Sequence, residues 1–260
     1  MIKYDRKLKI FYSTKVNDDS FFSGFGTRLT GDGRNVTNIF SFFGDNKVSL
    51  KKLVVPEQIH STNVVYYSLD DETSLPGIAE QATESTMIPT SISDTDAVVT
   101  AAVNVALTVK TGDCVPIIFV DKSAGMIGIS HQGWRGSLKK LPVKVVEKMV
   151  EKGAKKEEIV AAIGPAIGAC CYDINDDHYY SFLEEFDGYA NKIFSTRGGK
   201  KYLNLSLLNY LFLIDCGIRK GNIDFFPFCT SCDKERFFSY RRDFKKKLYS
   251  EMFSFVEMIS

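Results

Sequence analysis

Two short apolar runs joined by a polar turn constrain the fold of this chain more than any other feature. Pro116–Asp121 and Gly125–His131 have the composition of strands, and the residues between them favour a turn. If the hairpin is centred on Lys122–Ser123, Cys114 lies opposite His131. Opposed side chains in an antiparallel pair have Cβ atoms about 5 Å apart. The sequence therefore predicts a thiol and an imidazole close together at the open end of a hairpin.

The remaining pattern predicts a mixed fold. Short β-branched and aromatic runs predict further strands at Lys9–Tyr12, Val54–Val55, Asn63–Tyr67, Ala97–Thr100, Val105–Val109, Ile223–Phe226 and Phe237–Arg241. Helical patterns occupy Leu138–Lys152, Asn175–Phe186 and Asn204–Cys216. We expect the polar residues 70–95 to form a long surface loop. Because strands and helices are mixed without strict alternation, we predict an α+β fold in a single domain, 1–260.

Composition and charge exclude several classes of protein. The chain has 260 residues, of which 44% are apolar and 25% charged, as in an average soluble globular protein. Lys and Arg (33) balance Asp and Glu (32), so no global field attracts nucleic acid or an anionic membrane. No membrane span or signal-peptide core is apparent, and we expect a cytoplasmic protein with its six cysteines reduced.

Seven motifs resemble those of one known family. They are PEQIHS (56–61), DAVVT (96–100), TGDCVP (111–116), SHQGWRG (130–136), IGPAIGACCYDI (163–174), CT (229–230) and FFSYRRD (237–243). In this order they resemble the laccase-domain family of multicopper polyphenol oxidoreductases, whose members look like purine nucleoside phosphorylases. The resemblance implies a four-layer α/β/β/α sandwich of mixed sheets. It also implies conversion of purine nucleosides and phosphate to purine base and ribose 1-phosphate, with adenosine deaminase activity beside it.

The resemblance further implies a zinc ion held by His60, Cys114 and His131. Three protein ligands with an open fourth position are typical of catalytic zinc. The ligands are 54 and 17 residues apart, so only a folded β scaffold can assemble them. Phosphate would need hydrogen-bond donors, and three arginines suit bidentate phosphate contact. They are Arg135 and Arg241 of the motifs above and Arg28 of the segment Gly26–Gly31, which resembles the family's N-terminal motif.

The paired cysteine and histidine leave a second chemistry open. Cys114 could be a thiolate nucleophile with His131 as its base and His60 as a polarising group, which would make a cysteine hydrolase or deamidase. Metal removal separates the two hypotheses. A protein that only binds would leave three reactive side chains in one site unexplained. A multicopper oxidase is rejected, because its copper sites need mostly imidazoles and the chain has three histidines, with His178 outside the motifs.

Two further cysteine pairs give weaker signals. Cys229 and Cys232 have CxxC spacing, which is typical of a redox pair or of half a zinc site. No second pair lies near them in the sequence. We expect Cys170 and Cys171 to pack behind the turn that contains Pro165.

Overall fold

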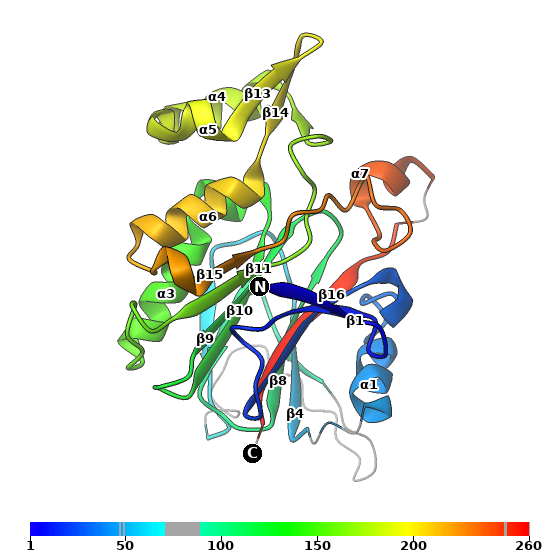
Figure 1. Cartoon of the computed structure of the whole chain (residues 1–260), viewed down its shortest axis with the longest axis vertical. Helices are drawn as coiled ribbons and strands as arrows, with labels where there is room; N and C mark the ends of the chain where they lie inside the picture. Colours follow the sequence, from blue (N-terminus) through cyan, green and yellow to red (C-terminus); the bar gives the residue numbers. More distant parts are fainter. Residues whose placement is uncertain (47, 49, 71–88, 247–248, 260) are drawn as a thin grey trace.

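Two mixed β-sheets lie face to face at the centre of the molecule (Figure 1). The computed structural model describes residues 1–46, 48, 50–70, 89–246 and 249–259. The seven-stranded sheet has the order β1 (Ile2–Asp5), β2 (Ile10–Ser13), β3 (Phe21–Gly26), β16 (Met252–Met258), β8 (Val105–Thr111), β4 (Lys52–Pro56) and β6 (Thr90–Ile92). The six-stranded sheet has the order β15 (Ile223–Phe225), β11 (Val160–Ile163), β9 (Val115–Asp121), β10 (Met126–Gln132), β7 (Ala97–Thr100) and β5 (Val64–Tyr67). Most strand pairs are antiparallel, but β4 runs parallel to β8, and β5 runs parallel to β7.

Strand β9 shows how the sequence supplies two cores at once. Every residue of β9 is buried. Ile118 and Val120 join the core between the two sheets, whereas Ile117 and Phe119 join the core on the other side of the six-stranded sheet. Successive strand residues point to opposite faces. An unbroken apolar run is therefore what a strand buried on both faces requires.

Helices cover the outer face of each large sheet. Helix α1 (Val36–Asp45) lies over the seven-stranded sheet, and α2 (Trp134–Leu138), α3 (Leu141–Glu151) and α6 (Leu205–Asp215) lie over the six-stranded sheet. The other helices are α4 (Asp176–Glu185), α5 (Ala190–Ile193) and α7 (Tyr240–Asp243). Phe42 and Phe43 of α1 pack on Phe255 of β16, with ring centroids 5.2 and 5.1 Å apart. Helices α3 and α6 pack together over the six-stranded sheet. The expected α+β class and four-layer α/β/β/α sandwich are thus confirmed.

A small third sheet stands at one end of the sandwich. It has the order β12 (Asp173–Ile174), β14 (Lys200–Leu203) and β13 (Phe194–Arg197). Figure 1 shows β13 and β14 with α4 and α5 at the top, beyond the ends of the large sheets. Short 3-10 turns lie at Arg28–Thr30, Asp187–Tyr189, Lys220–Asn222 and Phe244–Lys246.

The predicted helices are confirmed, and their ends have local causes. The side chains of Asn175 and Asn204 accept hydrogen bonds from the first backbone N–H groups of α4 and α6, as N-cap residues do. Gly153 and Gly217 follow the ends of α3 and α6 with φ of 107°, a conformation that glycine adopts without steric cost. The predicted helix Leu138–Lys152 is broken at Lys140, which separates α2 from α3.

The central hairpin forms, but its register differs by two residues from the predicted one. His131 lies opposite Pro116, and the same register places Gly133 opposite Cys114. The turn is displaced because the carboxylate of Asp121 accepts hydrogen bonds from the two residues that follow Lys122, which moves the centre along the chain. A shift of two residues preserves the face of each side chain. Cys114 and His131 therefore still point to the same side.

Two other sequence-based expectations need correction or restriction. Phe237–Arg241 is not a strand, because the Ser239 hydroxyl caps α7 by accepting from the N–H of Arg242. The predicted loop 70–95 lies largely outside the described residues, since 71–88 are not described, and its end contains strand β6.

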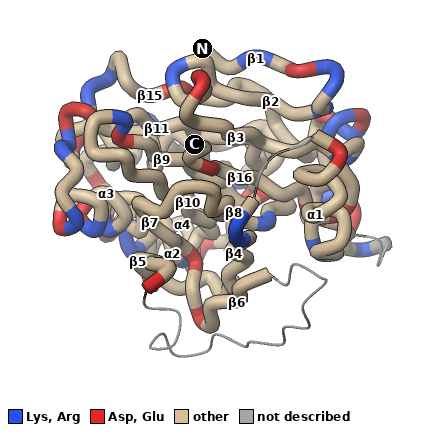
Figure 2. The backbone as a smooth tube through the Cα atoms, turned by 90° about the horizontal axis from the view of Figure 1, so that it is seen from below, with Lys and Arg blue, Asp and Glu red and all other residues tan. Residues whose placement is uncertain are grey.

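Charged residues lie mainly at the periphery of the sandwich. Figure 2 shows basic and acidic positions interspersed around the edge, whereas the stacked strands at the centre are mostly neutral. Within the described residues, no helix is long and apolar enough to cross a membrane.

Gly164→Ala should destabilise the fold at the point where β11 ends between the two sheets. A β-carbon at Gly164 would lie 2.4 Å from the ring of Phe25 and 2.8 Å from Pro116. Overpacking of this kind costs about 1–3 kcal/mol. Denaturant unfolding followed by circular dichroism measures the decrease in the free energy of unfolding.

Gly44→Ala is the matched control, because Gly44 lies within α1 and, among the described residues outside the backbone of that helix, no atom lies within 4 Å of the added carbon. Alanine should there raise the free energy of unfolding by about 0.5–1 kcal/mol. Equal stability of the Gly164→Ala variant and the unchanged protein would contradict the packing described at Phe25.

Candidate metal centre

Three strand ends bring His60, Cys114 and His131 together. His131 is the penultimate residue of β10, Cys114 directly precedes β9, and His60 follows β4 in the facing sheet. Their ligand atoms all lie within 4.8 Å of one another. Nε2 of His60 is 3.9 Å from Sγ of Cys114, and the two imidazole centroids are 4.8 Å apart. The structure therefore assembles these three side chains from segments that are far apart in the chain.

The carboxylate of Asp96 positions both imidazoles. Its Oδ1 accepts from Nδ1 of His131 at 2.7 Å and from the backbone N–H of His60 at 3.1 Å. Its Oδ2 accepts from the backbone N–H of Ile59 at 3.2 Å and from the N–H and hydroxyl of Ser61 at 2.6 and 2.7 Å. Asp96 is fully buried. When Nδ1 of His131 donates to this carboxylate, Nε2 is left to accept or to bind a metal.

The charges of the site favour a thiolate. Burial raises the pKa of the Cys114 thiol, but the charge and hydrogen bond of His131 and the contact with His60 outweigh burial and lower that pKa to about 7. Burial lowers the pKa of His131, but Cys114 and Asp96 raise it to about 10. A thiolate is the form of cysteine that binds metals and attacks electrophiles, whereas His131 must lose the proton that this raised pKa gives it before it can bind a metal.

Gly133 makes room for the imidazole of His60. A β-carbon at this position would lie 2.4 Å from Cδ2 and 3.2 Å from Nε2 of His60. His60 itself has a positive φ of 61°, which is uncommon for a residue other than glycine. The backbone amides bonded to Asp96 hold His60 in this conformation.

A second buried carboxylate, Asp113, organises the opposite side of the site. Its Oδ1 accepts from the hydroxyl of Thr230 at 2.6 Å. Its Oδ2 accepts from the hydroxyl of Ser239 at 2.9 Å and from the backbone N–H of Arg241 at 2.6 Å. Asp113 therefore ties the segment that ends in Cys114 to two C-terminal segments.

The three side chains line a cavity of about 700 Å³. Small-molecule sites commonly have volumes of about 300–1,000 Å³. The cavity is also lined by aromatic and basic side chains, among them Lys110, Trp134, Tyr172, His178, Tyr240 and Arg241. The rings of Trp134 and His178 are 4.2 Å apart, and burial, followed by the charge of Arg135, lowers the pKa of His178. The cavity can therefore hold a planar, partly polar ligand of nucleoside size.

The three arginines predicted as phosphate ligands do not come together. Arg241 lines the cavity, where its guanidinium pairs with Asp173. Arg135 is exposed and lies over the ring of Trp134 at 4.5 Å. Arg28 lies over Phe238 at 5.1 Å, and neither Arg28 nor Arg135 is among the residues that line the cavity. Phosphate contact by any of them stays a prediction.

Sequence reasoning missed several residues of the site. Asp96 and Asp113 had one available signal, because Asp96 directly precedes the apolar run Ala97–Val99 and Asp113 directly precedes Cys114. Lys110 precedes the TGDC motif and gave no signal of its own. His178 was placed outside the motifs, yet the first turn of α4 turns it toward Trp134.

The residues fit a metal ion. Two imidazoles and one thiol converge, a buried carboxylate orients His131, and a cavity lies open beside the group. This donor set suits a borderline-soft cation such as zinc. The same donors also form a Cys114–His131–Asp96 chain of the kind found in thiol hydrolases.

Comparison with known proteins decides the family. The profile of the family described as "Multi-copper polyphenol oxidoreductase laccase" matches residues 14–258, nearly the whole chain. The chain belongs to this family. A relative from an unknown prokaryotic organism, named "Adenosine deaminase RL5", is 32% identical over 253 residues, covering 90% of this chain and 92% of the relative.

Other members of the laccase-like family are also similar. "Purine nucleoside phosphorylase YlmD" of Bacillus subtilis (strain 168) is 34% identical over 173 residues, which cover 65% of this chain and 60% of the relative. A crystal structure titled as the Bacillus licheniformis hypothetical protein YfiH superimposes with a TM-score of 0.83 at 26% identity, covering 99% of this chain and 98% of that one. The family and the fold are therefore established for this chain.

Asp96→Asn should weaken metal binding while the size of the side chain is kept. Both oxygens of Asp96 accept from donors, so an amide NH₂ in place of either oxygen would face N–H or O–H groups. Loss of an orienting partner typically lowers metal affinity about 10–100-fold. Competition with a chromophoric chelator measures the affinity.

Asp94→Asn is the matched control, because Asp94 is exposed and its φ of 52° suits asparagine. The affinity of that variant should equal that of the unchanged protein. An Asp96→Asn variant that binds metal as tightly as the control would show that Asp96 does not orient the ligands.

Proposed function

We propose that this protein is a zinc-dependent purine nucleoside phosphorylase that also deaminates adenosine. The observation that supports this most is the convergence of His60, Cys114 and His131 at a nucleoside-sized cavity. The relatives named for both activities support the purine substrate class. In phosphorolysis the ribose C1′–N9 bond breaks, a bond from C1′ to a phosphate oxygen forms, and the purine takes up a proton.

The chain's own residues would bind and orient the reactants. Trp134, Tyr172 and His178 offer ring faces to a purine, and these faces also exclude water. Lys110 and Arg241 place positive charge on the cavity wall, where phosphate would bind. For Arg241 this binding competes with its ion pair to Asp173.

His60, Cys114 and His131 would hold the zinc ion. Zinc in such a site acts as a Lewis acid and lowers the pKa of water toward neutrality, which suits deamination. Asp96 keeps Nε2 of His131 turned toward the metal by accepting from Nδ1 at 2.7 Å. We also propose a cytoplasmic location, since all six cysteines are free thiols and cytosolic thiols are kept reduced.

A second candidate function is hydrolysis by a cysteine nucleophile. The specific observation in its favour is the order of Cys114, His131 and Asp96, which matches a nucleophile, its base and the group that orients the base. A nucleophile mechanism needs no metal. Activity that survives complete metal removal would therefore favour this candidate over the phosphorylase.

Purine release that depends on phosphate tests the proposed function. We expect free purine base from adenosine or inosine with phosphate present, and inosine from adenosine without it. Chromatography of the incubated nucleosides measures both. Removal of metal by a chelator should abolish conversion, and added zinc should restore it. If no purine nucleoside is converted at any phosphate concentration, the proposal is wrong.

Cys114→Ala should abolish turnover and leave the fold intact. The substitution removes one of the three proposed metal ligands. Cys114 directly precedes β9 and is not one of the buried residues of the hydrophobic cores, so its loss should affect stability little. Turnover and melting temperature are measured together.

Cys216→Ala is the control, because Cys216 lies at the end of α6 with its thiol bonded to the carbonyl of Leu213. We expect this variant to keep its activity and to lose about 1 kcal/mol of stability. An active Cys114→Ala variant would place the reaction elsewhere.

A further inference from the structure

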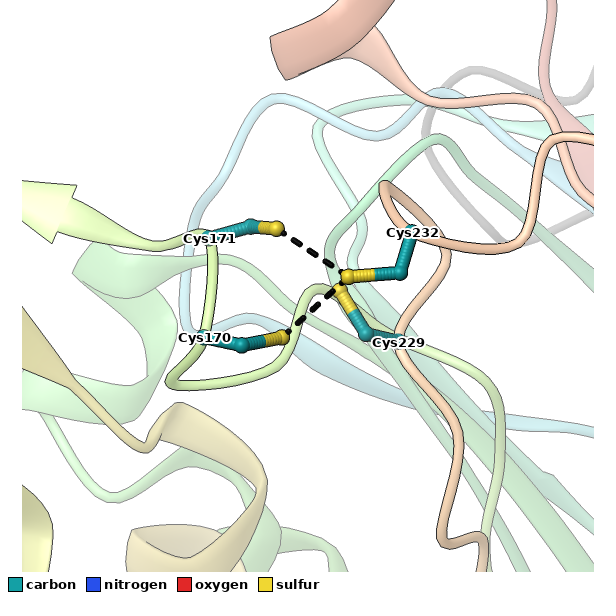
Figure 3. A group of neighbouring side chains, drawn as sticks. All are labelled: Cys170, Cys171, Cys229 and Cys232. Carbon is teal, nitrogen blue, oxygen red and sulfur yellow. Dashed lines mark hydrogen bonds between the residues drawn. The ribbon is translucent and has the colours of Figure 1, made fainter.

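Four cysteines converge on one point beside Tyr172, a residue that lines the cavity. Figure 3 shows Cys170 and Cys171 on one loop and Cys229 and Cys232 on another, with their sulfur atoms turned toward one another. All four sulfur atoms lie within 4.8 Å of one another. Cys229 and Cys232 have no second cysteine pair near them in the sequence. The fold supplies that pair from Cys170 and Cys171, about sixty positions upstream. The expectation that Cys170 and Cys171 only pack behind a turn is wrong.

The sulfur separations match a tetrahedral metal site. Sγ of Cys232 lies 3.5 Å from Sγ of Cys170 and 3.3 Å from Sγ of Cys171. Four thiolates at about 2.3 Å from a central zinc ion are about 3.8 Å from each other. A disulfide would need about 2.05 Å between two sulfur atoms, and all four residues are free thiols.

Backbone geometry also brings the sulfur atoms close. The N–H of Gly168 donates to Sγ of Cys229 at 3.1 Å. A β-carbon at Gly168 would lie 3.1 Å from Cβ of Cys229 and 3.2 Å from Sγ of Cys170. A glycine at this position therefore lets the two cysteine loops approach each other.

Three arginines bind the backbone of the two cysteine loops. Arg197 donates to the carbonyl of Ala169 at 2.5 Å, and Arg241 donates to that of Cys171 at 3.3 Å. Arg242 donates to the carbonyl of Thr230 at 3.0 Å. A divalent cation with four thiolate ligands has a net charge of about −2. Arg241 and Arg242 are paired with Asp173 and Asp243, so these two arginines mainly hold the cysteine loops in place by their hydrogen bonds. The guanidinium of Arg197 would offset part of the charge of the site.

We propose that Cys170, Cys171, Cys229 and Cys232 form a second, structural zinc site, distinct from the site in the cavity. A structural zinc site has four protein ligands and no open position. Such an ion would link the loop that continues into Tyr172 to the loop that leads to Arg241. Both of these residues line the cavity. The second zinc ion would thus hold two walls of the cavity at a fixed distance.

Zinc content of single-site variants tests the proposal. The protein is expressed with added zinc, purified without chelator and analysed by mass spectrometry of the metal. We expect about two zinc ions per chain in the unchanged protein and about one in each of Cys114→Ala and Cys232→Ser. The double variant should contain none, and the Cys216→Ser control should contain two.

The zinc contents of these variants distinguish failure of this proposal from failure of the proposed function. Zinc that is lost in Cys114→Ala but unchanged in Cys232→Ser would overturn the four-cysteine site alone. Zinc that is unchanged in Cys114→Ala but lost in Cys232→Ser would overturn the cavity site alone.

X-ray absorption of zinc in the Cys114→Ala variant identifies the ligands without disturbing the four cysteines. We expect four sulfur neighbours at about 2.3 Å and no nitrogen. Nitrogen in the first coordination shell would overturn the proposal. Alkylation after denaturation with chelator and without reductant should modify all six cysteines. A disulfide between any two of the four would also overturn it.

Discussion

The hydrogen bonding of the buried Asp96 carboxylate is the interaction on which the geometry of the candidate metal centre depends. It accepts hydrogen bonds from the loop that carries His60 and from the ring of His131, which lie in different sheets. A buried carboxylate is costly unless it is fully hydrogen-bonded. The backbone amides that satisfy Asp96 hold His60 in a left-handed conformation. The stability of this end of the sandwich and the geometry of its ligands therefore have the same cause.

Asp113 repeats this arrangement on the other side of the cavity. Its two oxygens bind Thr230, Ser239 and the backbone of Arg241, so the segment before Cys114 is attached to the C-terminal loops. Asp113 directly precedes Cys114 in the sequence and Asp96 directly precedes the strand β7, but each carboxylate binds segments far from it in the chain. The cavity is thus lined by loops together with the ends of strands and helices, which these two carboxylates hold in place.

The sequence predicted the fold class, about half of the described strands and the helices α3, α4 and α6, because apolar periodicity and capping residues are local signals. It also placed Cys114 and His131 on one face of a hairpin, although the register was two residues off, since hydrogen bonds of Asp121 move the turn. The four-cysteine cluster could not be predicted, because the two loops meet only after the sheets are folded. The contacts of Asp96 were hidden for the same reason.

The space at Gly133 limits how the sequences of related chains can differ. A β-carbon there and the observed imidazole of His60 would occupy the same volume. Any related chain with a side chain at this position must move or replace its histidine at the position of His60, so the two positions can change only together. In a family member that retains the histidine but has a larger residue in place of the glycine, the imidazole cannot take the position beside Cys114 and His131 that it has here.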